Sequence, residues 1–322
     1  MRVLLLVNPT ASSVTPRKRR AIRRIIASQH DVEVAETSRR GHAKLLAHAA
    51  ARDKFDVVAV YAGDGTLNEA ASGLLHTDTA LSALPGGSTN VYSQTLGYPR
   101  AADDAARALL DALSHDSVKR VSVGMTNERP FLFCTGIGFD ASVIRRVERH
   151  SRRLKRLASH PLHIAAAFNT FFSADGRAVR VDIDVDPDID GAGGKTNERI
   201  SDVRFGIISK TTPYTHLGRL PLHVNRNAGL DTRLSLTAFT QLKALSLIGG
   251  AASSIRTGKF LHGRKDVVQL DDIGTLHVRA ETPFPYQVDG DDVGDTTELH
   301  IALETDALTV ALPPPAPHRE HS

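Results

Sequence analysis

The strongest constraint on the fold is an alternation of strand and helix patterns over the first 75 residues. Apolar runs at 3–7 and 56–61 have the composition of buried strands, and 31–35 is a further predicted strand. Each is followed by a segment in which apolar residues recur three or four positions apart, as in an amphipathic helix. Alternation of this kind builds a parallel sheet with helices on both faces. We therefore predict an α/β domain at the N-terminus.

Three turns in this region have residues that suit phosphate binding. The turn at 8–12 follows the first strand, the turn at 62–66 follows the strand at 56–61, and the turn at 85–90 follows a short apolar segment. Glycines in the second and third turns let backbone amides approach an anion, and a helix N-terminus adds a favourable dipole. Each turn alone is also typical of a tight turn with a helix cap. Three of them at one sheet edge favour a site for the phosphates of a nucleotide.

After about residue 120 the pattern changes to short runs rich in Val, Ile, Phe and Thr, which predict a mostly antiparallel second domain. The runs are 120–124, 131–135, 179–185, 202–208, 234–239, 266–270, 275–280 and 299–303. A helical stretch at 141–173 interrupts them. We predict an α/β domain over 1–122 and a β-rich domain over 123–312, whose last strand is free to return to the first domain. The Pro-rich tail at 313–322 is predicted to be disordered.

Positive charge is concentrated in two segments of the chain. The net charge is only +4, but residues 17–24 and 145–156 together carry +12. An anionic partner is therefore expected, either phosphate groups or an acidic membrane surface. Aromatic residues make up 5% of the chain and Trp is absent, so few side chains can stack on bases and no nucleic-acid partner is expected.

The location expected from the sequence is cytoplasmic. The single cysteine, Cys134, fits a reducing compartment. No apolar run approaches the roughly 18 residues that span a bilayer, and the apolar run at 3–7 is read as a strand because Asn8-Pro9 interrupts it.

Five short segments together resemble the diacylglycerol kinase catalytic-domain superfamily, which includes bacterial soluble lipid kinases and sphingosine kinases. They occur in the family's order across residues 1–310. The segments are Asn8-Pro9, Gly63-Asp64-Gly65-Thr66 with Asn68-Glu69, Pro85-Gly86-Gly87-Ser88-Thr89-Asn90, Gly136-Ile137-Gly138-Phe139-Asp140-Ala141 and Val288-Asp289-Gly290-Asp291. The resemblance implies an ATP-dependent lipid kinase. It also implies an N-terminal domain similar to that of NAD kinases and phosphofructokinases, followed by a C-terminal β-sandwich.

The resemblance also assigns roles to individual residues. The Gly-Asp-Gly-Thr turn would bind nucleotide phosphates, with Asp64 as a catalytic residue and a ligand of Mg²⁺. The residues implied to line the ATP site are Asn8, Thr10, Gly63, Gly65, Thr66, Gly87, Ser88 and Asn90. Asp291 occupies the position of a candidate general base that would take the proton of the lipid hydroxyl. The Asp-Gly pair before it is also common in plain hairpin turns.

The chain departs from the family's usual pattern in several places. Ala62 replaces the first glycine of a doublet, Val91 stands where an aspartate is frequent, and Asp291 is one methylene shorter than the usual glutamate. The family's structural Mg²⁺ loop often carries an Asp-Gly pair, and the nearest segment here is Asn227-Ala228-Gly229-Leu230-Asp231. We assign no second metal site to that segment.

These features predict a cytoplasmic kinase, peripherally associated with the membrane, that uses ATP and Mg²⁺ to phosphorylate a lipid hydroxyl, with diacylglycerol as the first expected acceptor. The expected partner is a lipid substrate at an anionic membrane surface, and edge strands allow, but do not require, a homodimer.

Two alternative functions remain. One is an NAD kinase-like enzyme, which shares the Gly-Asp-Gly-Thr turn. The other is a catalytically weakened lipid-binding or regulatory protein, which the departures at 62, 91 and 291 would suit. The sequence does not identify the lipid.

Overall fold

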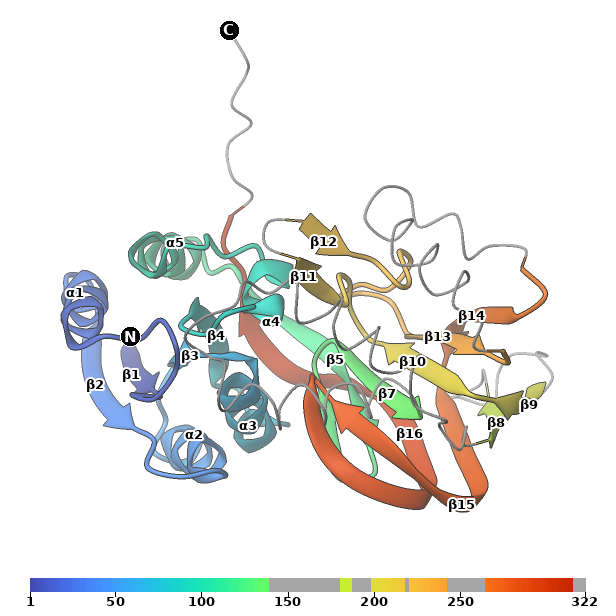
Figure 1. Ribbon diagram of the computed structural model, residues 1–322. Helices are drawn as coiled ribbons and strands as arrows, with labels where there is room; N and C mark the ends of the chain where they lie inside the picture. Colours follow the sequence, from blue (N-terminus) through green and yellow to red (C-terminus); the bar gives the residue numbers. More distant parts are fainter. Residues whose placement is uncertain (139–179, 187–197, 218–219, 242–263, 315–322) are drawn as a thin grey trace, which may run out of the picture. The chain divides into compact units, whose positions relative to one another are not determined.

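The structure is a computed structural model that describes residues 1–138, 180–186, 198–217, 220–241 and 264–314 (Figure 1). The chain forms two compact units. The first contains Met1–Ser122 and the C-terminal part from Thr305, and the second contains Val123–Glu304. The chain passes between them within two strands, β5 (Val118–Thr126) and β16 (Asp291–Ala311).

Several sequence predictions fall outside the described residues. They are the helical stretch at 141–173, the basic segment at 145–156, the end of the segment Gly136–Ala141, and most of the tail predicted to be disordered.

The first unit is built on a parallel sheet in the order β4-β3-β1-β2. The end of β16 adds a strand beside β4, parallel to it, through the pair Val310 and Leu81. Every residue of β3 and β4 is buried, as expected for strands covered on both faces. The bounds of the strands are β1 (Arg2–Val7), β2 (Asp31–Glu36), β3 (Val57–Ala62) and β4 (Ala80–Pro85).

Helices cover this sheet in two pairs, with α1 against α5 and α2 against α3, on opposite sides of the strands (Figure 1). Helix α1 shows why the sequence folds this way. Thr15 accepts a hydrogen bond from the Lys18 amide, Pro16 takes the first helical position, and Ile22 and Ile26 are buried. The helices are α1 (Pro16–Ile26), α2 (His42–Arg52), α3 (Asp64–Leu74), the short α4 (Val91–Thr95) and α5 (Ala102–Ser114). Of the helices that the structure describes, none is both long and apolar enough to cross a membrane.

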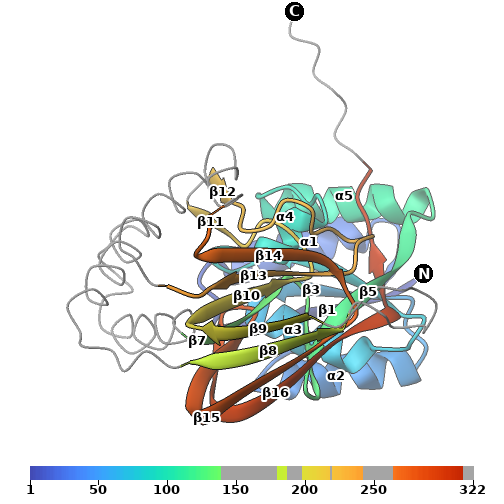
Figure 2. The same cartoon turned by 90° about the vertical axis from the view of Figure 1, so that its right-hand side faces the viewer.

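The second unit is an antiparallel β structure in which the long strand β15 pairs with different strands along its length. The first part of β15 pairs with β8 and its last part pairs with β7, and the register shifts between Arg279 and Phe284. Figure 2 shows β15 and β16 as one long hairpin beside β8. Side chains from both sets of strands, among them Ile183, Leu236 and Phe284, share one buried core.

The remaining strands of this unit are β6 (Arg129–Phe131), β7 (Cys134–Gly138), β8 (Val181–Asp186), β9 (Glu198–Val203), β10 (Phe205–Ser209), β11 (Thr215–Leu217), β12 (Leu220–Leu222), β13 (Leu234–Phe239), β14 (Val267–Ile273) and β15 (Thr275–Val288). The α/β first unit and the mostly antiparallel second unit confirm the predicted fold class.

Two predicted strands are divided in the structure. The run at 202–208 is split between β9 and β10, next to Asp202, whose φ of 59° turns the backbone. The run at 131–135 is split between β6 and β7, because the amides of Leu132 and Phe133 donate to a buried carboxylate and not to a neighbouring strand.

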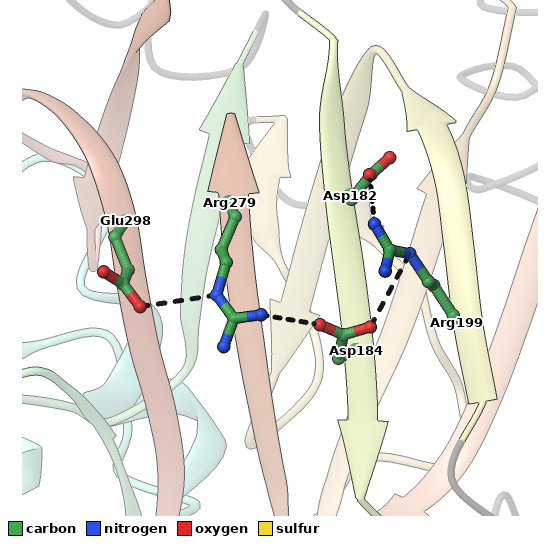
Figure 3. Close-up of polar contacts among 5 residues, drawn as sticks. All are labelled: Asp182, Asp184, Arg199, Arg279 and Glu298. Atoms are coloured by element: carbon green, nitrogen blue, oxygen red, sulfur yellow. Dashed lines mark hydrogen bonds and ion pairs between the residues drawn. The ribbon is translucent and has the colours of Figure 1, made fainter. Parts of the chain in front are cut away.

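A ladder of charged side chains crosses four neighbouring strands of the second unit (Figure 3). Arg279 on β15 contacts Glu298 on β16 at 3.5 Å and Asp184 on β8 at 3.2 Å. Arg199 on β9 contacts Asp182 at 2.7 Å and Asp184 at 3.8 Å. A hydrogen bond from Arg199 lowers the pKa of Asp182. Because these side chains are largely exposed, the ladder contributes little to stability and mainly favours one strand pairing.

Candidate functional site

The three turns predicted to bind phosphate lie against one another in the first unit. The amide of Gly86 donates to the carbonyl of Ala62 at 2.9 Å, which joins the turn at 85–90 to the turn at 62–66. The amide of Ser13 donates to the carbonyl of Gly86 at 2.9 Å, and the Asn8 side chain donates to the Thr66 hydroxyl at 2.9 Å. These contacts join residues 24 to 73 positions apart in the sequence, so the three turns are parts of a single site.

Glycine is required where the second and third turns meet. A Cβ atom on Gly87 would lie 2.7 Å from the Cα of Gly63, and one on Gly86 would lie 2.8 Å from the amide nitrogen of Ala62. Both distances are well below the 3.5–4.0 Å optimum for non-bonded carbon atoms. The glycines at 86 and 87 thus let two backbone segments touch.

Asp64, the first residue of α3, connects the second turn to the start of α4. Its Oδ2 accepts hydrogen bonds from the Thr89 hydroxyl and the Val91 amide, each at 3.1 Å, and its Oδ1 accepts one from the Tyr92 amide at 3.2 Å. The carboxylate therefore caps α4, whose own first flanking residue, Asn90, provides no side-chain cap.

Burial raises the pKa of the Asp64 carboxyl, and the amides of Val91 and Tyr92 and the Thr89 hydroxyl oppose that shift. The opposing bonds all favour the ionised form, because each donates to the carboxylate. Tyr61 lies behind the same turn and donates from its hydroxyl to the carbonyl of Ser13 at 3.1 Å. Burial raises the pKa of Tyr61 to about 12, so it stays a donor at neutral pH.

Several of the other residues predicted to bind the nucleotide make hydrogen bonds within the turns. Oδ1 of Asn8 accepts from the amide and the hydroxyl of Thr10 at 3.0 and 2.8 Å. The Asn90 side chain exchanges two hydrogen bonds with the backbone of Gly87, at 2.7 and 3.0 Å. Ser88 is exposed, and among the described residues its hydroxyl makes no hydrogen bond. Gly65 and Thr66 lie in the first turn of α3, whose amides have no partner within the helix.

A pocket of about 360 Å³ borders the third turn. Gly87 and Asn90 form one side of it. Lys18 of α1, Arg100 just before α5 and Arg107 within α5 contribute positive charge, and Arg107 pairs with Asp104 at 3.3 Å. Two aspartates at the start of α5 also line it. The size is typical of a small-molecule site, and the lining suits a polar, partly anionic ligand.

Asp64 is the predicted ligand of the metal ion. Its Oδ1 accepts a hydrogen bond from the Tyr92 amide, and a carboxylate oxygen has two lone pairs. Across the described ranges there is no group of three or more His, Cys, Asp or Glu side chains that could hold a metal without other ligands. A Mg²⁺ ion here would therefore take one carboxylate from the protein and further oxygens from substrate phosphates, which is how Mg²⁺ is usually bound.

Asp291, the predicted general base, lies in the second unit at the start of β16. It follows a two-residue turn, Asp289-Gly290, in which both residues have positive φ, at 48° and 80°. This is the geometry of a type I′ hairpin turn, which joins β15 to β16. The Asp291 carboxylate accepts from Arg129 at 2.8 Å, and both side chains are 28% exposed.

The neighbouring Asp289 anchors this hairpin. Its buried carboxylate accepts from three successive backbone amides, those of Leu132, Phe133 and Cys134, at 2.7, 3.0 and 3.1 Å. The Gln287 side chain accepts from the amide of Gly290 at 2.7 Å, which holds the turn from the other side. The backbone position of Asp291 is thus determined by Asp289.

Three residues that organise these sites are not among the site residues predicted from the sequence. Ser13 connects the first turn to the third through its amide and through its hydroxyl, which donates to the carbonyl of Gly87 at 3.1 Å. Thr89 donates to Asp64, and Asp289 anchors the hairpin. All three lie in or beside the predicted segments, but their partners are far away in the sequence.

Comparison with known proteins identifies a family for the first part of the chain. Residues 2–125 match the diacylglycerol kinase catalytic domain. A Streptococcus pneumoniae protein, provisionally named a lipid kinase, is 32% identical over 119 residues, which cover 36% of this chain and 39% of that protein. A diacylglycerol kinase of Bacillus subtilis is 28% identical over 141 residues, 42% of this chain and 46% of that protein. The matched segment thus spans less than half the length of these relatives.

Similarity to a solved structure extends over almost the whole chain. A crystal structure from Bacillus anthracis, provisionally named a diacylglycerol kinase, superposes with a TM-score of 0.74 and covers 97% of both chains. The sequence identity is 22%, so this likeness concerns the fold.

Proposed function

We propose that this protein is an ATP-dependent lipid kinase with diacylglycerol as its acceptor. The match of residues 2–125 to the diacylglycerol kinase catalytic domain supports the predicted superfamily. The observation that carries the proposal is the direct contact of the turns at 8–13, 62–66 and 85–90. Together they bring the first amides of α3, several hydroxyls and a carboxylate into one region, and a pocket with three cationic side chains borders the third turn. The names of the curated relatives support a lipid acceptor.

Phosphoryl transfer depends mainly on positioning and on neutralising the charge of the phosphates. We assign the binding of ATP phosphates to the backbone of Gly63, Gly65 and Thr66, whose amides open the helix α3. Asn8, Thr10 and the turn at 85–90 complete the site. Asp64 would hold Mg²⁺, which when bound neutralises phosphate charge. The same carboxylate keeps the second and third turns together, so its two roles are coupled.

We assign the proton transfer to Asp291. In the reaction, the acceptor hydroxyl oxygen bonds to the γ-phosphorus of ATP, the bond from that phosphorus to the bridging oxygen breaks, and ADP leaves. The hydroxyl proton would pass to the Asp291 carboxylate. The ion pair with Arg129 at 2.8 Å would hold this carboxylate in place.

A membrane-docking role for α1 follows from its charge. Arg17, Lys18, Arg20, Arg23 and Arg24 are exposed, and none has an ion-pair partner among the described residues. A lipid acceptor lies in a bilayer, and basic residues near an anionic surface contribute roughly 1 kcal/mol each. We propose that α1 draws the enzyme to anionic membranes.

Vesicle binding tests the role of α1. We expect the double variant Arg20→Ser/Arg24→Ser to bind phosphatidylserine vesicles on the order of tenfold more weakly at low salt. The variant Lys44→Ser/Lys54→Ser removes two exposed charges from elsewhere in the first unit and serves as the control. Equal binding by both variants would exclude α1 as the docking element.

The activity itself is tested with labelled ATP, Mg²⁺ and mixed micelles. Diacylglycerol, sphingosine, ceramide and phosphatidylinositol are offered separately, with NAD in a parallel reaction. We expect labelled phosphatidate, and no product from the Asp64→Asn variant prepared in the same way. Label in NADP would support the NAD kinase alternative, and ATP binding without any product would support the weakened-enzyme alternative.

A further inference from the structure

Lys210 is a fully buried lysine in the second unit, directly after β10. Its side chain is among the largest fully buried ones, and the residue is 1% exposed. The ammonium nitrogen Nζ donates to three backbone carbonyl oxygens, those of Gly229, Leu230 and Thr232, at 2.8, 3.1 and 2.9 Å. An ammonium has three donors and no acceptor, so all its hydrogen-bonding capacity is used here.

The backbone of Lys210 is held in place independently of these bonds. Its amide donates to the carbonyl of Phe133 at 2.9 Å, and the Thr211 hydroxyl donates to the carbonyl of Leu132 at 3.2 Å. The amides of Leu132 and Phe133 are the ones that Asp289 accepts. Hydrogen bonds to the segment at 132–133 thus fix the backbone from which the lysine side chain extends.

The loop that receives the ammonium, residues 225–232, contains little regular structure. Asn225 and Asn227 donate to the two oxygens of Asp271, both at 2.7 Å, which fixes one end of the loop. At the other end the Thr232 hydroxyl accepts from the amide of Gly229 at 2.7 Å. The carbonyls between these anchors converge on Nζ.

The surroundings of Nζ resemble a cation site more than an ordinary ion pair. The three acceptors are neutral carbonyls, the kind of oxygen ligand that hard metal ions take from loops. Burial lowers the pKa of Lys210 to about 8, and the nearby charge of Asp231 opposes that shift. Asp231 is itself exposed, so the carbonyls provide the direct contacts.

We propose that the Lys210 ammonium is the built-in cation of the loop at 225–232 and takes the place of a bound metal ion there. This loop is the segment where the family resemblance implies a structural Mg²⁺. The residues present do not fit that ion. Mg²⁺ binds oxygens at about 2.0–2.1 Å. An ion at that distance from these three carbonyls would lie next to the positively charged Lys210 ammonium, which already donates to all three. Ala228 precedes Gly229, so the Asp-Gly pair is missing as well.

The inference concerns the stability of one loop and does not depend on lipid kinase activity. Hydrogen exchange of the wild-type protein without nucleotide tests it directly. We expect the amides of 225–232 to exchange at the same rate in EDTA, in millimolar Mg²⁺ and in millimolar Ca²⁺, with an unchanged melting temperature. Slower exchange of these amides with either metal would overturn the proposal.

The variant Lys210→Met keeps the length of the side chain and removes its charge and its donors. We expect exchange at 225–232 to become faster on the order of tenfold or more, because hydrogen bonds from charged donors are lost and three acceptors are left unsatisfied. Lys265→Met, at an exposed lysine of the same unit, should leave this exchange unchanged. Wild-type exchange in Lys210→Met would contradict the proposal. If that variant does not fold, the metal titration of the wild type decides.

Discussion

The substitution Gly87→Ala tests the contact between the second and third turns. The added Cβ would lie 2.7 Å from the Cα of Gly63 and 3.1 Å from Oδ1 of Asn90. Because the optimal distance between such carbons is 3.5–4.0 Å, one turn must move by about 1 Å. Overpacking of this kind costs about 1–3 kcal/mol, partly offset by about 0.4–1 kcal/mol from the stiffer unfolded chain.

A displacement of this size matters more for activity than for stability. A misplacement of about 1 Å can reduce catalysis by about a hundredfold, so we expect kcat/KM for ATP to fall by at least tenfold. The melting temperature should fall by a few degrees, at about 2–4 °C per kcal/mol for a unit of this size.

Gly63→Ala is the matched comparison for this substitution. Its Cβ would meet the Cα of Gly87 at 3.4 Å, close to an ordinary contact, so we expect a much smaller loss of activity. Steady-state kinetics and thermal unfolding of both variants provide the measurement. A Gly87→Ala enzyme with wild-type kcat/KM and melting temperature would refute the inferred contact.

Three further substitutions test individual side chains. Asp64→Asn replaces an acceptor by an amide that cannot satisfy all three donors, so we expect lost turnover and a loss of about 1–3 kcal/mol of stability; unchanged thermal unfolding would exclude its capping role. Asp289→Asn should destabilise the second unit by a similar amount, because the amides of 132–134 lose their shared carboxylate; denaturant unfolding measures this, and an unchanged midpoint would contradict it. Arg129→Met should change stability by about 1 kcal/mol or less, since the pair is partly exposed, but should lower kcat because the Asp291 carboxylate loses the side chain that positions it. An unchanged kcat would argue against the assigned role of Asp291.

The order of the elements in the first unit was predictable because each signal is local. Buried strands such as β3 are continuous apolar runs, and helices such as α1 carry their cap and apolar spacing within a few residues. The positions of the three turns followed from the same local patterns, since parallel strands bring their carboxyl ends to one edge.

The contacts that shape the site were not predictable from these patterns. Asp64 accepts from residues 25–28 positions away, and Ser13 contacts Gly87 across 74 positions. Such pairs arise only when the strands pack, and short motifs do not encode them. The asparagines at 8 and 90 were predicted as nucleotide ligands, and that remains a prediction. The structure shows in addition that the Asn8 side chain joins the first turn to the second and that the Asn90 side chain holds the backbone of the third turn.

In the second unit, too, contacts between distant segments were not predictable from the sequence. The run at 275–280 was predicted as a short strand, yet β15 continues to Val288, because its last part finds a different partner, β7. The role of Lys210 is not predictable either, since nothing near it in the sequence indicates that three carbonyls from 229–232 surround its ammonium.

Hydrogen exchange with and without ATP tests the central claim most directly, because it locates the nucleotide without assuming the acceptor. We expect slower exchange at 8–13, 62–66 and 85–90 when ATP and Mg²⁺ are added to the full chain, with the effect lost in Gly87→Ala. Tight ATP binding that protects other segments and leaves these three turns unchanged would contradict it.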